Sequence, residues 1–430
     1  MGFATASYQI EGAPEEDGRG PSIWDTFCKI PGKIADGSSG DVACDSYHRV
    51  SEDIALLKLT GAKAYRFSIS WSRIIPLGGR NDPVNEKGIA YYAKLVDDLL
   101  KEGITPFVTL FHWDLPDNLD KRYGGLLNKE EFVKDYAHYA RVLFKAYPKV
   151  KNWITFNEPW CSSILGYSTG LFAPGHTSDR SKSAVGDSSR EPWTVGHNIL
   201  IAHGAAVKIY REEFKAKDGG QIGITLNGDG VYPWDASDPK DVEAAERKLE
   251  FSISWFADPS TMANIPIPCA PSSATVSLLS PTTKHKKTEP EEDDFAGNLE
   301  LLFENKQGDN IGPETQSVWL RPNPQGFHDL ILWLSKRYGF PTIYITENGT
   351  SLLRENDIPY PDILKDTFRA DYFRDYIRAM ASAVEKGADV RGYLGWSLMD
   401  NFEWAEGYET RFGVTYVDYE GDRDENPRRE

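Results

Sequence analysis

Along most of its length the chain repeats one pattern of hydrophobic and polar positions: an amphipathic helical stretch, then a glycine, then a short run of β-branched and aromatic residues. Residues 86–102 are typical, because their apolar side chains recur every three or four positions and Gly103 follows where glycine ends a helix. The strand-favouring run 106–111 comes directly after it. The full series predicts helices at 51–61, 86–102, 129–146, 194–214, 326–338 and 368–386, and strands at 65–69, 106–111, 153–156, 222–226, 343–346 and 390–398. Ser51 is followed by two acidic residues and is the predicted N-cap of the first helix.

Helices and strands that alternate over a whole chain predict parallel strands joined by helical crossovers. Each predicted strand also ends in polar side chains, as at 112–114 (His, Trp, Asp) and 399–401 (Met, Asp, Asn). This is typical of an α/β fold of the (β/α)8 or TIM-barrel type, whose site lies at the carboxyl ends of the strands. An open, doubly wound sheet is the alternative, but no G-x-G-x-x-G follows a strand and the polar strand ends are too many for one switch point. We therefore predict one barrel domain over residues 1–430.

Three places depart from a regular barrel. The first strand, at Gly2–Ala6, has almost nothing before it, so we expect it to be shortened. An eight-stranded barrel requires a sixth strand between residues 226 and 343. The segment 260–294 in this region is instead rich in Pro, Ser, Thr and clustered charges. This composition favours an irregular or disordered segment, with 274–280 as its one β-like run. The final helix is expected to be missing, because the chain ends soon after Tyr419 in a charged tail.

Composition and charge argue against several kinds of partner and cofactor. The formal net charge of −17 disfavours nucleic acid and anionic membrane surfaces as partners. No apolar run approaches the roughly 20 residues of a membrane helix, and the start lacks a signal-peptide pattern, so we expect a cytoplasmic protein. Four scattered cysteines and eight histidines form no metal-binding motif, so we expect no metal and no cofactor.

Two strand-favouring runs end in a glutamate beside an amide. The run 153–157 leads into Glu158 and Pro159, and the run 343–346 leads into Glu347 and Asn348. A proline cannot donate to a ladder, so the first strand stops at Glu158. Two carboxyl groups at strand ends are what a glycosidase needs, about 5–5.5 Å apart for retention and about 6.5–9.5 Å apart for inversion. These glutamates are therefore the candidate catalytic pair. The sequon at Asn348 adjoins Glu347, and we interpret it as site backbone rather than a glycan acceptor.

Further polar and aromatic residues stand at strand ends. Arg66 is expected to point inward near a carboxylate, either to keep it ionised or as a structural ion pair. Gln9, His112 and Asn157 suit sugar hydroxyls, although each type is more often a satisfied core group. The motif 395–404 places Glu403 among indoles, an arrangement suited to a pyranose ring. Its members that we expect at the site are Trp396, Glu403 and Trp404.

The chain as a whole resembles glycoside hydrolase family 1, in particular β-glucosidases of fungal type. The resemblance rests on motifs at 6–12, 65–71, 112–114, 155–159, 345–349 and 396–404, in family order. It implies a (β/α)8 barrel and retaining hydrolysis of terminal β-D-glucosyl residues in cellobiose and in aryl or alkyl β-glucosides, as in cellulose degradation. The implied partner is a small β-glucoside or oligosaccharide.

The resemblance also implies roles for particular residues. Glu158 would be the acid/base and Glu347 the nucleophile, with Arg66 beside the nucleophile. The implied substrate contacts are Gln9, His112, Asn157, Trp396, Glu403, Trp404 and Phe412, with Trp160 and Leu165 at the aglycone entrance. Glu403 stands where phospho-glycosidases of the family tend to carry Ser, which disfavours a 6-phosphorylated substrate.

The family pattern normally includes a sixth-strand tyrosine that bonds the nucleophile, and this sequence has no tyrosine between Tyr232 and Tyr338. It also normally has an apolar segment ahead of Gly2 and a final helix. These departures support a second hypothesis, a catalytically impaired pseudoenzyme that binds sugars or folds poorly because barrel elements are missing.

Overall fold

A computed structural model of the chain describes residues 1–261, 281–286, 295, 297–419 and 428–429. The chain divides into two compact units. The first unit comprises Met1–Thr225, Ser397–Glu409 and Gly413–Glu430, and the second comprises Leu226–Trp396 and Thr410–Phe412. The expectation of a single domain over 1–430 stays a prediction, and the two units are described in turn.

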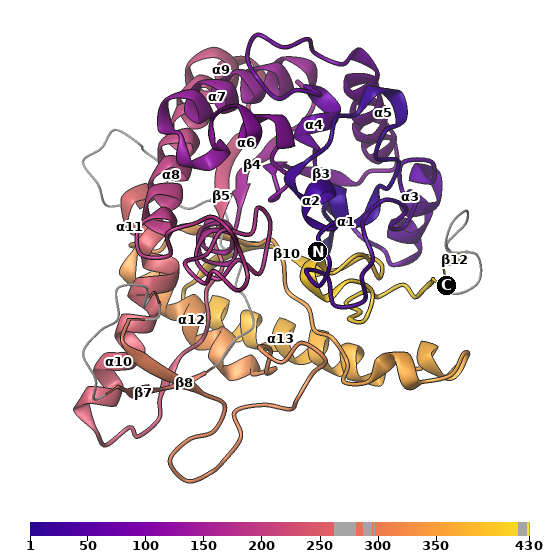
Figure 1. Ribbon diagram of the computed structural model, residues 1–430. Coiled ribbons are helices and arrows are strands. Elements are labelled where there is room, and N and C mark those ends of the chain that lie inside the picture. The colour runs from indigo at the N-terminus through magenta and orange to yellow at the C-terminus, as the bar shows by residue number, and fades with distance from the viewer. Residues whose placement is uncertain (262–280, 287–294, 296, 420–427, 430) are drawn as a thin grey trace. The chain divides into compact units, whose positions relative to one another are not determined.

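A parallel sheet of five strands forms the centre of the first unit, in the order β5-β4-β3-β2-β1 (Figure 1). Its strands are β1 (Gly2–Ala4), β2 (Ala64–Ser68), β3 (Thr105–Phe111), β4 (Asn152–Asn157) and β5 (Gln221–Thr225). Consecutive strands are neighbours, as expected when each connection is a single helical crossover. The strands β2 to β5 agree with the predicted runs to within one or two residues, and β1 is short, as expected.

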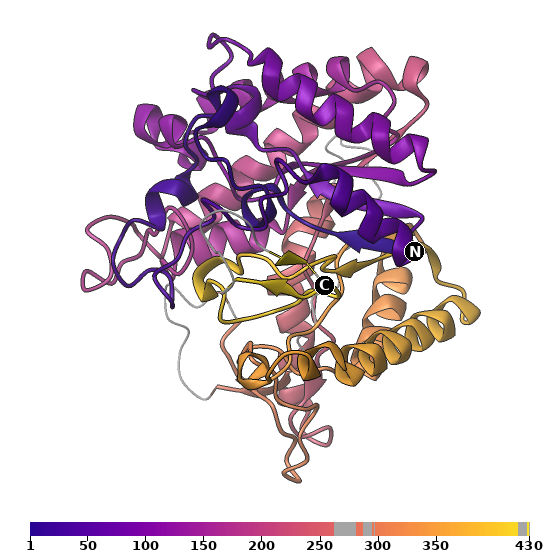
Figure 2. The ribbon, with the colours of Figure 1, turned by 90° about the vertical axis from the view of Figure 1, so that its right-hand side faces the viewer.

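Helices of the first unit follow the predicted apolar periodicity. They are α1 (Ser7–Ile10), α2 (Ile23–Phe27), α3 (Val50–Leu59), α4 (Trp71–Ile74), α5 (Glu86–Lys101), α6 (Asp117–Tyr123), α7 (Lys129–Ala146), α8 (Glu191–Ile209) and α9 (Lys215–Asp218). Asn85 and Asn128 cap α5 and α7, each accepting a first-turn backbone N–H at 3.2 Å. In both views α7 and α8 lie side by side along the sheet (Figures 1 and 2).

The prediction of Ser51 as the N-cap of α3 is wrong. Arg49 precedes the helix, and its carbonyl oxygen accepts the N–H of Glu52 at 2.9 Å. Its guanidinium also pairs with Asp45 at 3.1 Å. These contacts hold Arg49 at the turn that opens the helix, so Ser51 lies inside the first turn.

Aromatic side chains fill the space between this sheet and its helices. Trp71 stacks on Tyr139 of α7, with ring centroids 4.6 Å apart and planes 6° from parallel. Tyr136, also on α7, stacks on Phe156 of β4 at 4.3 Å. The hydroxyls of Tyr136 and Tyr139 donate to backbone carbonyl oxygens, so both buried hydroxyls have a hydrogen-bond partner. This packing fixes the helices against the strands that carry the polar strand ends.

The second unit contains a parallel pair, β9 (Thr342–Ile345) and β10 (Asp389–Trp396), with two long helices. These are α12 (Pro324–Arg337) and α13 (Thr367–Glu385), which lie side by side in Figure 2. Two shorter helices, α10 (Pro239–Leu249) and α11 (Trp255–Thr261), precede them. The helices and strands at 326–398 match the predicted boundaries closely.

A separate three-stranded sheet occupies part of the region where the sixth strand was expected. It consists of β6 (Tyr232–Pro233), β7 (Thr282–His285) and β8 (Leu299–Leu302). The expected irregular segment 260–294 is described only in part, and within that part residues 282–285 form β7. The β-like run 274–280 lies outside the described residues.

After β10 the described chain forms the 3-10 turn η8 (Trp404–Glu406) and the short pair β11 (Val417–Asp418) and β12 (Arg428–Arg429). Asp400 anchors this stretch, because its two carboxylate oxygens accept the N–H groups of Gly413 at 2.9 Å and Val417 at 3.2 Å. None of the helices in the described part of the chain is both long and apolar enough to cross a membrane.

Candidate active site

Glu158 lies at the carboxyl end of β4, as the sequence predicts. Its φ is +40°, a left-handed conformation that is uncommon for a residue with a side chain. Its N–H donates to the carbonyl oxygen of Thr225, the last residue of β5, at 3.0 Å. The side chain is 9% exposed. The sheet and the following Pro159 therefore hold this carboxyl group at the strand end in a strained backbone.

A π-helical turn, Cys161–Leu165, follows directly. The Cys161 thiol donates to Oε2 of Glu158 at 3.3 Å, a contact that the sequence did not predict. Trp160 and Leu165 are half-buried, so each presents part of an apolar side chain to solvent. Their exposure agrees with the expected position at a substrate entrance, which stays a prediction.

Arg66, in the middle of β2, contacts Asn157 at the end of β4, and Asn157 contacts His112 just after β3. Arg66 is fully buried and donates from its guanidinium to Oδ1 of Asn157 at 2.6 Å and to Thr109 at 3.0 Å. The amide of Asn157 lies 3.0 Å from Nε2 of His112. Burial, with a smaller contribution from the positive charge of Arg66, holds the pKa of His112 well below its ordinary value. His112 is therefore neutral, and its Nε2 accepts from the Asn157 amide.

Gln9, on α1, is paired with the segment that follows β10. Its amide nitrogen donates to Oδ1 of Asn401 at 2.9 Å, to the carbonyl oxygen of Phe402 at 2.8 Å and to Oε2 of Glu403 at 3.3 Å. Its carbonyl Oε1 is buried and has no hydrogen-bond partner among the described residues. The amide nitrogen of Gln9 thus orients Glu403, while Oε1 can accept a hydrogen bond from a ligand hydroxyl.

Trp404 is the centre of an aromatic cluster in the first unit. Its indole stacks on His112, with centroids 5.9 Å apart and planes 14° from parallel. Four further rings surround it: Tyr8, Trp24, Trp113 and Phe172. Trp404 and Trp113 both have positive φ, at +48° and +73°. Trp113 and Tyr8 lie within the sequence motifs. Aromatic residues are equally typical of a hydrophobic core, so the sequence did not predict that these two would join the cluster around Trp404.

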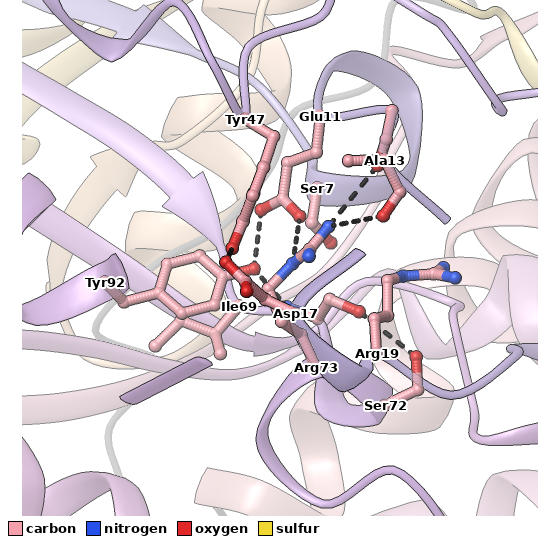
Figure 3. Close-up of polar contacts among 12 residues, drawn as sticks. Ser7, Glu11, Ala13, Asp17, Arg19, Tyr47, Ile69, Ser72, Arg73 and Tyr92 are labelled. Atoms are coloured by element: carbon pink, nitrogen blue, oxygen red, sulfur yellow. Dashed lines mark hydrogen bonds and ion pairs between the residues drawn. The ribbon is translucent and has the colours of Figure 1, made fainter. Parts of the chain in front are cut away.

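A buried ion pair between Glu11 and Arg73 lies at the end of α1 (Figure 3). Oε2 of Glu11 accepts from Nε of Arg73 at 3.1 Å, and its other oxygen accepts from the hydroxyl of Tyr92 at 2.5 Å. The same guanidinium donates to the carbonyl oxygens of Gly12 and Ala13. The residues at the end of α1 are therefore tied to α4 and α5, which fixes the helix that presents Gln9.

In the second unit, Glu347 follows β9 and is partly exposed between buried neighbours. The adjacent Asn348 is 1% exposed, so its sequon is not available to a glycan, in agreement with its interpretation as site backbone. Trp396, the last residue of β10, donates its N–H to the carbonyl oxygen of Asn348 at 2.8 Å. Phe412 belongs to the same unit and is also buried.

Of the twelve predicted site residues, the first unit thus contains the acid/base candidate and most of the expected sugar contacts. It holds Gln9, Arg66, His112, Asn157, Glu158, Trp160, Leu165, Glu403 and Trp404, and the second unit holds Glu347, Trp396 and Phe412. Gln9 contacts Glu403, and a second connected set runs from Arg66 through Asn157 and His112 to Trp404. No group of three or more His, Cys, Asp or Glu within the described ranges is arranged to hold a metal ion.

Comparison with known proteins identifies the class. The pattern of Glycosyl hydrolase family 1 matches residues 1–267 and 270–430. A crystal structure of a GH1 β-glucosidase from the fungus Humicola insolens, in complex with glucose, is 66% identical and superposes with a TM-score of 0.97, covering 100% of this chain and 94% of that one. The chain therefore belongs to glycosyl hydrolase family 1 and is a glycoside hydrolase, with the predicted (β/α)8 fold.

Further relatives narrow the class to β-glucosidases. Beta-glucosidase 1B of Phanerodontia chrysosporium is 53% identical over 439 residues, which cover 97% of this chain and 81% of that protein. A rice β-glucosidase mutant, solved in a covalent complex with Glc, is 40% identical with a TM-score of 0.94, covering 100% of this chain and 94% of that one. None of these comparisons supports the alternative of a pseudoenzyme.

Proposed function

We propose that this chain is a retaining β-glucosidase in which Glu347 is the nucleophile and Glu158 the general acid/base. In the first step the Glu347 carboxylate attacks the anomeric carbon while Glu158 protonates the departing glycosidic oxygen, which leaves as an alcohol. A covalent glucosyl–enzyme ester results. In the second step Glu158 removes a proton from water, which displaces Glu347 and releases glucose with its β configuration retained.

The observation that carries this proposal is the position of Glu158 at the end of β4, next to the hydrogen-bonded set of Arg66, Asn157 and His112. A carboxyl group beside the uncharged side chains of Asn157 and His112 can donate to a leaving oxygen while they bind the sugar. The covalent complex of the rice relative with Glc supports a two-step path through a glucosyl–enzyme. The likeness to β-glucosidases over the whole chain supports the same reaction class.

The substrates proposed are small β-glucosides, among them cellobiose and aryl or alkyl β-glucosides, with cellulose breakdown as the physiological setting. Gln9 and Glu403 together supply an acceptor, Oε1, and a carboxylate, and adjacent sugar hydroxyls can donate to both. Trp404 is buried against His112 and holds this residue, a proposed sugar contact, in place. The carboxylate of Glu403 would repel a 6-phosphate, so an unphosphorylated glucosyl group is favoured.

A matched pair of variants, Glu347→Gly and Glu158→Gly, tests the two roles with an activated aryl β-glucoside and sodium azide. Loss of the nucleophile leaves space for azide to attack the anomeric carbon directly, so Glu347→Gly should form the α-glucosyl azide. Loss of the acid/base leaves the covalent intermediate intact, so Glu158→Gly should form the β-glucosyl azide. Wild-type turnover by either variant in the absence of azide, or the opposite azide products in its presence, would overturn the assignment.

A further inference from the structure

The backbone ladder of the second unit stops short of the proposed nucleophile. The parallel pairing of β9 with β10 ends at Ile345 opposite Tyr393. Glu347 lies two residues beyond that pair, outside the strand. The contacts of the residues just after it therefore help to set its position along the chain, because a strand end without a ladder is free to fray.

Asn348 provides such a contact through its side chain. Its Oδ1 accepts two phenolic hydroxyls, from Tyr393 of β10 at 2.5 Å and from Tyr372 of α13 at 3.2 Å. All three side chains are 5% exposed or less. Burial raises the pKa of both tyrosines well above the ordinary value, so both hydroxyls stay protonated donors in any assay buffer.

Tyr393 therefore holds the chain on both sides of Glu347. Its backbone pairs with Ile345 on one side, and its hydroxyl binds Asn348 on the other. The carbonyl oxygen of Asn348 accepts the N–H of Trp396, also from β10. One strand thus fixes the nucleophile's segment at three points.

Close packing after Asn348 keeps this segment from shifting. A Cβ on Gly349 would lie 1.7 Å from the carbonyl oxygen of Trp396, so the two backbones approach as closely as glycine permits. The carbonyl oxygen of Thr350 accepts from Nε of Arg369 at 3.1 Å, and Arg369 is held by a buried pair with Glu355. Rotation of Asn348 away from the tyrosines would leave its side-chain carbonyl oxygen buried without a donor, which is unfavourable.

We propose that Tyr393 and Tyr372 are positioning residues for the nucleophile and act on Glu347 through Asn348. The inference rests on the proposed function, in which Glu347 attacks the anomeric carbon. Attack requires an oxygen of Glu347 near the anomeric carbon and in line with the leaving oxygen, and small misplacements of a reacting group are costly. The hydroxyl pair keeps the segment in that position before substrate binds.

The experiment measures the nucleophilic step by itself in the full-length protein. A 2-deoxy-2-fluoro-β-glucoside with a dinitrophenyl leaving group needs no proton from Glu158 and traps the glucosyl–enzyme, which intact-mass spectrometry detects. Tyr393→Phe should lower the trapping rate and kcat at least about fivefold, the value of one hydrogen bond of about 1 kcal/mol, with little change in KM. Tyr372→Phe should lower both less, because its hydrogen bond is longer.

Tyr338→Phe is the control. Tyr338 belongs to the same unit and is half-buried, and its hydroxyl donates to Oδ1 of Asp258 at 2.7 Å, away from the hydrogen bonds of Asn348. Its variant loses a tyrosine hydrogen bond to a side-chain oxygen. It should lose stability and keep the wild-type trapping rate.

A double-mutant cycle tests whether the tyrosines act through Asn348. Asn348→Ala should slow trapping, and adding Tyr393→Phe to it should have no further effect on trapping. Equal trapping rates in wild type and Tyr393→Phe, or additive losses in the double variant, would overturn the inference and leave the β-glucosidase function standing. Trapping that persists in Glu347→Gly would instead overturn the proposed nucleophile. If Tyr393→Phe does not fold, Tyr372→Phe and Asn348→Ala supply the same comparison.

Discussion

The side-chain amide of Gln9 donates to Oε2 of Glu403 at 3.3 Å, joining two residues that are 394 positions apart in the sequence. The same nitrogen also donates to Asn401 and to the carbonyl oxygen of Phe402. One amide therefore fixes both the carboxylate and the backbone of the segment that carries Trp404. The position of Glu403, and of Trp404 next to it, depends on this relationship.

Replacing Gln9 by Leu should weaken glucoside binding. Three acceptors lose their donor and a ligand loses the free Oε1, so we expect KM to rise by about 10- to 100-fold, equivalent to about 1.4–2.7 kcal/mol. Steady-state kinetics with an aryl β-glucoside measure the change. Gln221→Leu is the control. It removes an amide hydrogen bond between Gln221 of β5 and Asn152 of β4 and should leave KM unchanged. An unchanged KM in Gln9→Leu would remove Gln9 from the proposed contacts.

The left-handed backbone of Glu158 should make glycine more stable than alanine at that position. An L-residue at φ +40° carries a steric cost of about 1–2 kcal/mol that glycine lacks, so we expect Glu158→Gly to exceed Glu158→Ala in free energy of unfolding by about 1 kcal/mol. Urea denaturation monitored by tryptophan fluorescence measures both. At Asn152, where β4 begins, the order should reverse, since glycine costs stability in an ordinary strand. Greater stability of alanine than of glycine at both positions would show that Glu158 is unstrained.

Asp114 should make the protein less stable as the pH rises through the mildly acidic range. Burial raises the pKa of this carboxyl from its ordinary value of 3.8 to about 7, while Ser7 donates to its Oδ2 at 3.0 Å. Between pH 4 and 7 the unfolded chain releases a proton that the folded chain retains. The free energy of unfolding therefore falls with rising pH, by up to about 1.4 kcal/mol per pH unit, and levels off above about 7.

Asp114→Asn removes this titration and keeps an acceptor for Ser7. We expect the stability of the Asn variant relative to wild type to increase between pH 5 and pH 7, measured by urea unfolding at each pH. A difference that does not change with pH would mean that Asp114 titrates at its ordinary value in the folded protein.

His203 should have the opposite effect, destabilising the protein as the pH falls. Burial, with a smaller contribution from Arg211, lowers its pKa from 6.5 to about 4, and its Nδ1 lies 2.8 Å from Oγ1 of Thr155. Between those pH values the unfolded chain binds a proton that the folded chain does not. The stabilisation is therefore complete above pH 6.5 and is lost toward pH 4, by about 3 kcal/mol at most.

His203→Phe lacks this titration. Its stability deficit relative to wild type, caused by loss of the Thr155 hydrogen bond, should shrink between pH 7 and pH 4.5 in the same unfolding assay. A deficit that stays constant over this range would show that His203 titrates alike in the folded and unfolded chains.

Local patterns in the sequence were sufficient for the elements that carry the site. Helix α7 (Lys129–Ala146) has the predicted boundaries, because its period of apolar residues, its Asn128 cap and the following Pro148 are all near-neighbour effects. The strand β4 likewise ends directly before Glu158, and β9 ends two residues before Glu347, since a strand's hydrophobic run and its breaker lie close together in the chain. Family motifs then placed these residues in a glycosidase.

Only the tertiary structure decided the contacts between distant segments. The sequence contains Gln9 and Glu403, but not their pairing, and it gives no sign that Cys161 contacts Glu158 or that the two tyrosines 372 and 393 meet at Asn348. Such contacts depend on how helices and strands pack, which a local pattern does not encode. The sequence by itself therefore determined which residues stand at the strand ends, and packing decided which partners orient them.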